Sequence, residues 1–183
     1  MSELSAAGTV HTVRWRDGKI IWRMWGKGPA VILIHGGFGS WSHWIRTIPA
    51  LAENRCVLVP DMPGFGDSDD FSMEDAGEEI AEALMDGLAQ LLDLSKGIDV
   101  VGFSFGTVIA GTLAAKLVGS APGVLRSLVL IAPAGLGISA RNFAGLRSSA
   151  PGMSDDEIRD MHRHNLGVVM IADPACITDE TID

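Results

Sequence analysis

The chain has 183 residues, 47% of them hydrophobic and 20% charged, which is typical of a globular domain with a hydrophobic core. Its net charge of −9 at pH 7 argues against nucleic acid or an anionic membrane surface as partner, because both would repel a net-negative chain. The two cysteines, Cys56 and Cys176, do not suggest a disulfide framework. With no recognisable leader and no membrane-spanning apolar run, we expect a cytoplasmic location.

The first part of the chain predicts a hairpin followed by buried strands. Residues 9–16 and 19–25 flank Asp17-Gly18, a pair typical of a hairpin turn. Continuous apolar runs are typical of strands buried on both faces, and two occur here, at 30–34 and 56–59. Between them, residues 41–53 have helical spacing, with a break or kink expected at Pro49.

The rest of the chain alternates helices with strands. Apolar residues at helical spacing predict a long helix over 72–92, with Ser72 and Asp75 as its capping box. The elements expected next are a strand over 97–101, a helix over 107–118 and a strand over 125–131. This alternation predicts an α/β fold with a mostly parallel sheet and crossover helices. Beyond residue 136 the pattern becomes irregular, and Ser154 is expected to cap a helix that ends near Leu166.

Three motifs follow three successive predicted strands. They are His35-Gly36-Gly37, then Asp61-x-Pro63-Gly64-x-Gly66-x-Ser68, then Gly102-x-Ser104-x-Gly106. The last is the nucleophile-elbow pattern in its expected strand–turn–helix context, where a strained turn raises the serine hydroxyl above the sheet. Gly102 and Gly106 are expected because a larger side chain would collide where strand and helix cross.

In this order, the motifs resemble those of the α/β-hydrolase fold, in particular its capped ester and carbon–carbon bond hydrolases. The resemblance covers residues 9–183. It implies that residues 1–136 are the N-terminal part of the hydrolase core and that 137–183 begin a helical cap. The family's C-terminal strands would then be missing from this chain, together with the acid and the histidine of its catalytic triad.

The resemblance also implies a role for each motif residue. Ser104 matches the nucleophile, which would form an acyl-enzyme. The backbone N–H of Phe105 would be one oxyanion donor, and that of Gly37 or Phe38 the other. The remaining motif residues would support this geometry: His35, Gly36, Gly102 and Gly106. A catalytic base at His35 is disfavoured, because the family's histidine at this position supports the oxyanion loop.

The predicted function is a serine hydrolase that acts on a small-molecule ester or related acyl compound, although this chain alone is expected to be inactive. No cofactor and no metal site are expected, and the oligomeric state stays open. A carbon–carbon bond hydrolase, a perhydrolase and an acyltransferase remain alternatives on the same scaffold. So does a non-catalytic binding protein, since a fold does not determine a function.

Other polar and aromatic residues have competing interpretations. Asp61 is expected to shape a turn by bonding local amides. Trp41 and Trp44 could either wall an acyl pocket or pack in the core. Exposed surface is favoured over a pocket role for His162 and His164, which lie two apart on a predicted helix. Surface or helix positions are also expected for His11 and His43, and packing is expected for Met153, Met161 and Met170.

Overall fold

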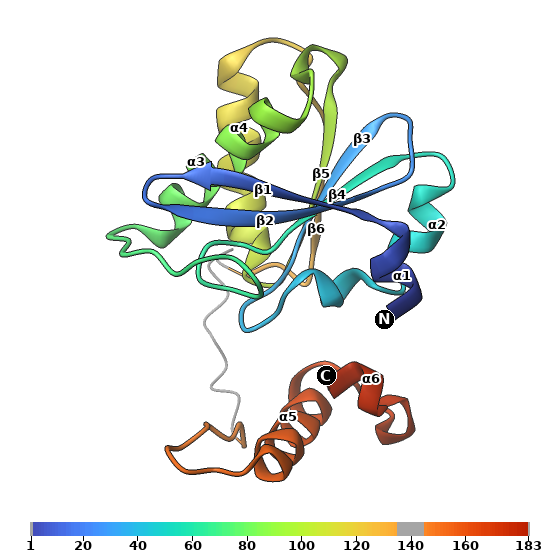
Figure 1. Ribbon diagram of the computed structural model, residues 1–183, viewed down its shortest axis with the longest axis vertical. Coiled ribbons are helices and arrows are strands. Elements are labelled where there is room, and N and C mark those ends of the chain that lie inside the picture. The colour runs from blue at the N-terminus through green and yellow to red at the C-terminus, as the bar shows by residue number, and fades with distance from the viewer. Residues whose placement is uncertain (1, 135–144, 183) are drawn as a thin grey trace. The chain divides into compact units, whose positions relative to one another are not determined.

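The computed structural model describes residues 2–134 and 145–182 (Figure 1). The chain divides into two compact units, Met1–Leu136 and Gly137–Asp183. The first contains a six-stranded sheet with flanking helices, and the second is helical in its described part. None of the helices within the described residues has the length and apolar character needed to cross a membrane.

The sheet has the strand order β1-β2-β4-β3-β5-β6 (Figure 1). Its first three strands pair antiparallel, and the series β4-β3-β5-β6 pairs parallel. The predicted hairpin and later strands are therefore confirmed, as is the mostly parallel sheet. The strands are β1 (Thr9–Trp15), β2 (Gly18–Trp25), β3 (Ala30–Ile34), β4 (Cys56–Pro60), β5 (Ile98–Phe103) and β6 (Leu125–Ile131).

Helices connect the parallel strands, as predicted. The first unit contains α1 (Ser2–Ala7), the 3₁₀ helix η1 (Trp41–Trp44), α2 (Ile48–Ala52), α3 (Ala76–Leu91), the 3₁₀ helix η2 (Leu94–Lys96) and α4 (Gly106–Ser120). The second contains α5 (Asp155–Val169), the 3₁₀ helix η3 (Pro174–Cys176) and α6 (Asp179–Ile182).

The alternating side chains of β3 join two hydrophobic clusters, one on each face of the sheet. Ile32 and Ile34 pack in a cluster that includes residues of α3 and α4. Val31 and Leu33 pack in a second cluster with residues of η1 and α2. Each fully buried side chain of this size contributes about 1.5–3 kcal/mol. Burial on both faces explains the continuous apolar run and gives the loop after β3 a rigid base.

Two predicted helices begin or run differently in the structure. The helix expected over 41–53 is split into η1 and α2, and Pro49 lies in the first turn of α2, where its missing N–H costs nothing. The helix expected from Ser72 begins only at Ala76. Its N-cap is Asp75, whose carboxylate accepts the N–H of Glu78 at 3.1 Å. The predicted Ser72–Asp75 capping box is therefore wrong.

Helix α1 was not expected from the sequence. Leu4 is the one large apolar side chain among its six residues, so the sequence shows no periodic apolar pattern there. The Leu4 carbonyl accepts a hydrogen bond from Nε1 of Trp25 at 2.8 Å. A contact between residues 21 positions apart therefore holds this helix to the sheet.

The predicted N-cap of α5 is confirmed. The N–H of Ser154 donates to Glu157 Oε2 at 2.7 Å, and the Ser154 side chain accepts the Glu157 N–H, which completes a capping box. The helix runs to Val169, three residues beyond the predicted end. Arg163 then donates to the Ile177 carbonyl at 3.2 Å, which ties α5 to the segment that precedes α6.

Candidate active site

The three sequence motifs lie at the carboxyl ends of three adjacent strands. His35 follows β3, Asp61 follows β4 and Ser104 follows β5, and β3 lies between the other two strands in the sheet. Functional groups in α/β proteins gather at this edge, where the connecting loops are free to vary. The structure therefore brings together motifs that are separated by as much as 69 positions, from residue 35 to residue 104, in the sequence.

Ser104 occupies a strained turn between β5 and α4. Its φ of 51° lies in the left-handed region, which costs a non-glycine residue about 1–2 kcal/mol. The turn is held by hydrogen bonds on both sides. The Ser104 N–H donates to the Ile131 carbonyl at 3.0 Å, and the Ser104 carbonyl accepts from the hydroxyl of Thr107 at 2.6 Å. The strain is thus maintained by the surrounding structure, a pattern common at functional sites.

The glycines beside Ser104 allow β5 and α4 to approach closely. A Cβ at Gly102 would lie 2.7 Å from the Cβ of Ala110, and a Cβ at Gly106 would lie 2.6 Å from the carbonyl oxygen of Ile34. Real Cβ atoms do not make such contacts, so neither site has room for a side chain. Gly106 also places the start of α4 directly against the end of β3.

His35 is completely buried and neutral. Burial lowers its pKa from 6.5 to about 4. Its Nε2 accepts the backbone N–H of Met62 at 3.0 Å, so the proton is on Nδ1, which donates to the Gly36 carbonyl at 2.7 Å. Both ring nitrogens are therefore engaged within the protein, which leaves neither free to take a proton from a nucleophile.

The hydrogen bond from His35 orients the next peptide group. In a trans peptide the C=O and the following N–H point in opposite directions. Because the Gly36 carbonyl points to His35, the N–H of Gly37 points away from it. The Gly36 N–H is held as well, since it donates to Nδ1 of His43 at 3.2 Å. The loop between His35 and η1 therefore has a defined backbone orientation at its start.

This loop lies against the Ser104 turn. A Cβ at Gly36 would be 3.2 Å from Cβ of Ser104, and a Cβ at Gly37 would be 3.7 Å from Cβ of Phe105. Phe38, the next residue, has a φ of 57° and a fully exposed side chain. The structure thus places the backbone at Gly36 beside the predicted nucleophile, and the backbone at Gly37 beside Phe105, the other predicted oxyanion residue.

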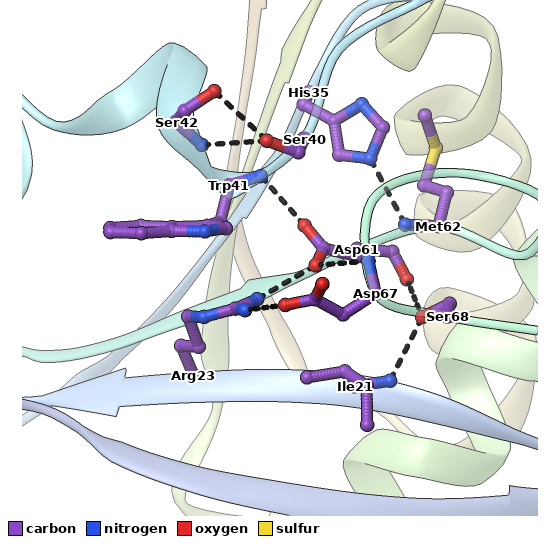
Figure 2. Close-up of polar contacts among 10 residues, drawn as sticks. All are labelled: Ile21, Arg23, His35, Ser40, Trp41, Ser42, Asp61, Met62, Asp67 and Ser68. Carbon is purple, nitrogen blue, oxygen red and sulfur yellow. Dashed lines mark hydrogen bonds and ion pairs between the residues drawn. The ribbon is translucent and has the colours of Figure 1, made fainter. Parts of the chain in front are cut away.

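A buried carboxylate connects this loop to the rest of the sheet. Figure 2 shows Asp61 between Trp41 and Arg23. Asp61 Oδ1 accepts the Trp41 N–H at 2.7 Å, and Oδ2 accepts from Arg23 at 2.7 Å and from the Asp67 N–H at 3.1 Å. The predicted local amide bond is present, at Asp67. The other two bonds reach outside the motif.

Arg23, the partner of this carboxylate, lies outside the three sequence motifs. It is a charged residue that follows three buried apolar residues of β2, Ile20 to Trp22, and only 7% of it is exposed. Its guanidinium also pairs with Asp67 and lies 4.9 Å from the ring centroid of Trp41. A buried arginine requires partners. The position of Arg23 directly after apolar strand residues was therefore the sequence feature that could have indicated a buried ion pair.

The remaining candidates have other surroundings. Trp44 is buried in a hydrophobic cluster, and Trp41 stacks on Trp25 with ring centroids 5.7 Å apart, so packing accounts for both. His162 is exposed, and Nε2 of His164 contacts the Gly145 carbonyl at 2.7 Å within the second unit. Among residues 2–134 and 145–182, no cluster of three His, Cys, Asp or Glu side chains could hold a metal ion.

His43 lies in η1, in agreement with the predicted helix or surface position. The residue remains exposed, but its ring packs against the end of β5, with its centroid 5.7 Å from that of Phe103. Burial of the ring lowers the pKa of His43. A neutral ring is required for its observed hydrogen bond, because a protonated Nδ1 could not accept the Gly36 N–H.

Comparisons with known proteins identify relatives over most of the chain. A family profile described as "alpha/beta hydrolase fold" matches residues 29–161, more than half of the sequence. A solved structure, Cfl2 from Burkholderia cenocepacia, superimposes with a TM-score of 0.72 at 22% identity, covering 97% of this chain and 64% of that one.

Three curated proteins illustrate the range of relatives. A dihydrolipoyllysine-residue acetyltransferase component of an acetoin cleaving system from Pseudomonas putida is 31% identical over 85% of this chain and 39% of its own length. A 2-hydroxy-6-oxo-6-phenylhexa-2,4-dienoate hydrolase from Burkholderia cepacia is 30% identical over 86% of this chain and 55% of its own. A pimeloyl-[acyl-carrier protein] methyl ester esterase from Vibrio parahaemolyticus is 32% identical over 51% and 34%. The chain therefore spans about half or less of these relatives.

Proposed function

Because the chain belongs to the α/β-hydrolase family, we propose that it supplies the nucleophile and the oxyanion loop of a serine hydrolase acting on an ester or related acyl compound. The observation that carries the proposal is the turn at Ser104, with its φ of 51° between β5 and α4. Hydrolases among the relatives support this reaction class. The second unit would be the start of a helical cap.

In the proposed reaction, Ser104 Oγ attacks the carbonyl carbon of the substrate and its proton passes to a base. The carbonyl oxygen then carries negative charge, which the N–H groups of Phe105 and of Gly37 or Phe38 would stabilise. Collapse of this intermediate expels the leaving group, which takes a proton, and forms an acyl ester on Ser104. Water then hydrolyses that ester and restores the serine.

Ser104 needs a base to become a strong nucleophile, and His35 is not available as one. His35 is engaged through both nitrogens. In this family the acid and the histidine follow the nucleophile in the chain, after further strands. We therefore propose that both belong to a longer protein of which these 183 residues are a part, and that this chain alone is inactive.

A carbon–carbon bond hydrolase is a second candidate. The relative from Burkholderia cepacia, a dienoate hydrolase, matches 86% of this chain. Such a reaction would use the same oxyanion site but would break a bond to carbon instead of a bond to oxygen. A panel of aryl esters and vinylogous diketones distinguishes the two reactions by which class is turned over faster.

Labelling with a fluorophosphonate tests the proposal, because this reagent reacts covalently with activated serines. In the full-length protein, the reagent should label Ser104, and Ser104→Ala should abolish labelling while leaving the fold intact. Ser95→Ala, at a serine in η2, is the matched control and should label normally. Persistent labelling of Ser104→Ala would remove Ser104 as the nucleophile, and an unlabelled wild-type protein would favour a binding protein.

A further inference from the structure

We propose that Asp61, paired with Arg23, is a positioning residue for the segment 36–40, which carries one of the two expected oxyanion donors, the N–H of Gly37 or Phe38. This inference rests on the proposed serine hydrolase function. Asp61 would not touch the substrate. It would act through the backbone of Trp41, the residue at which this segment meets η1.

The carboxylate of Asp61 is shared among three parts of the chain. It accepts the N–H of Trp41 from the loop after β3, the guanidinium of Arg23 from β2, and the N–H of Asp67 from its own loop (Figure 2). Asp61 has no exposed surface. A buried carboxylate with three N–H donors has a fixed position, because any rotation of the group would leave a donor unpaired.

Two consecutive residues hold both ends of the segment. Before it, the Met62 N–H donates to Nε2 of His35 at 3.0 Å. After it, Asp61 Oδ1 accepts the Trp41 N–H at 2.7 Å. Asp61 and Met62 directly follow β4, a strand in the interior of the sheet, so both anchors share one rigid base. The segment between them, 36–40, is short enough that its path depends on where its ends are held.

Arg23 couples the charge of Asp61 to the position of Trp41. Its NH1 donates to Asp61 Oδ2 at 2.7 Å, and its guanidinium also lies over the Trp41 ring. Arg23 therefore contacts both the carboxylate and the residue that the carboxylate holds. A negative charge buried without this cation would be strongly unfavourable.

The substitution Asp61→Asn separates charge from shape. An asparagine has one carbonyl oxygen and an NH₂ group, so it cannot accept from Trp41 on one side and from Arg23 and Asp67 on the other. Its NH₂ group would face at least one N–H donor. We expect the Trp41 N–H to lose its acceptor or the Arg23 pair to break, and either change would release the end of the segment.

A matched control exists at the opposite end of β5. Like Asp61, Asp99 pairs with arginine, but with two side chains, Arg55 and Arg126, and it accepts the hydroxyl of Ser127 at 2.8 Å. It is 14% exposed and lies at the start of β5, whereas Ser104 follows its end. Asp99→Asn thus removes a comparable charge from the same unit without touching the loop after β3.

The experiment measures the rate of fluorophosphonate labelling of Ser104 in the full-length protein, together with kcat and KM for p-nitrophenyl butyrate. Asp61→Asn should lower the labelling rate and kcat by about tenfold or more, because a misplaced oxyanion donor acts on the transition state. KM should change little, and Asp99→Asn should behave as wild type. A folded Asp61→Asn protein with wild-type labelling and kcat would overturn the proposal.

Arg23→Lys is the second variant, in case Asp61→Asn does not fold. Lysine keeps the charge but has a single ammonium group, which cannot match the fork that contacts Asp61 and Asp67. Its labelling rate should also fall below that of wild type, and an unchanged rate would count against the proposal. The thermal midpoints of all variants are recorded, so that a loss of stability is not mistaken for a loss of positioning.

Hydrogen exchange separates this proposal from the proposed function. In either substituted protein, Asp61→Asn or Arg23→Lys, the backbone amide of Trp41 should exchange faster than in wild type, and in Asp99→Asn it should not. If wild type is not labelled at all, the serine hydrolase function fails, and positioning for catalysis fails with it. Labelling of wild type with unchanged Trp41 exchange in both variants would overturn the positioning role alone.

Discussion

Nε2 of His35 accepts the backbone N–H of Met62 at 3.0 Å, and this bond determines which ring nitrogen carries the proton. With Nε2 occupied as an acceptor, Nδ1 donates to the Gly36 carbonyl. The histidine therefore has to be neutral, and its burial is consistent with a pKa of about 4. Protonation would turn Nε2 into a donor facing another donor, so acid should weaken the loop and the fold together.

The first prediction concerns stability against pH. The His35 pKa is 6.5 in the unfolded chain and about 4 in the folded one, so the unfolded state binds more protons between these values. Stability should be complete above pH 6.5 and should fall as the pH decreases towards 4, by up to about 3 kcal/mol from this group. Urea unfolding at a series of pH values measures the effect.

The matched variant for this prediction is His35→Asn, which removes the titrating ring. Its stability should be lower at pH 7 but should depend less on pH between 6.5 and 4.5. His43→Asn should retain most of the dependence, since His35 is the more deeply buried ring. An equally steep dependence in His35→Asn would show that another group is responsible.

The second prediction contrasts two glycines of the same helix. A Cβ at Gly106 would lie 2.6 Å from the Ile34 carbonyl oxygen, whereas a Cβ at Gly111 would meet nothing within 4 Å. Gly106→Ala should therefore destabilise the protein by about 2 kcal/mol or more through overpacking. Gly111→Ala should stabilise it by about 0.5–1 kcal/mol, because alanine restricts the unfolded chain and favours helix.

Chemical unfolding of both variants checks this contrast. The substitution is the same at both sites. A difference between their free energies of unfolding therefore reports on the close contact of Gly106 with the end of β3. If Gly106→Ala were as stable as Gly111→Ala, the close approach of α4 to the end of β3 would be in doubt.

Much of the sheet could be predicted, because β3 and β4 are continuous apolar runs and a hairpin-type turn lies between β1 and β2. Residues 125–131 were expected as a strand, and β6 has these bounds. Helix starts were less predictable, because a local pattern does not say which of several polar residues will cap. Ser72 and Asp75 both suit an N-cap. In the structure Asp75 caps α3, and Glu78 and Glu79 follow it in the first turn, where acidic side chains interact favourably with the helix dipole.

The motifs of the candidate site could be found from sequence because they are local patterns at strand ends. The partner of Asp61 could not. Arg23 is 38 positions away, and its pairing depends on β2 lying beside β4 in the sheet. The close approach of segment 36–40 to Ser104 depends in the same way on the order of β3 and β5. Such contacts depend on the order of the strands in the sheet, which the local sequence pattern does not determine.

The third prediction concerns the two thiols. Burial raises the pKa of Cys56, which lies at the start of β4, so less of it is thiolate at neutral pH. Cys176 is exposed in η3. Iodoacetamide should therefore modify Cys176 well before Cys56 in the native protein, as followed by mass spectrometry of tryptic peptides. In urea the two rates should converge, and faster native modification of Cys56 would contradict its burial.

The fourth prediction concerns β6, which pairs with β5 and has no second neighbour within the described residues. Its apolar side chains are open to solvent, with Val129 46% and Ile131 41% exposed. Exposed apolar edge strands promote pairing between molecules. The 183-residue chain expressed alone should therefore self-associate, which sedimentation velocity would detect as a concentration-dependent increase in size.

Val129→Lys should reduce this self-association, because a charged side chain on an edge strand opposes pairing with another molecule. Val118→Lys is the matched control. It makes the same change at a 62% exposed valine that belongs to the helix α4 and not to a strand. If both substitutions reduced association equally, added charge rather than the edge of β6 would be the cause. A monomeric wild-type chain with a cooperative melt would show that the exposed edge does not destabilise this part of the protein.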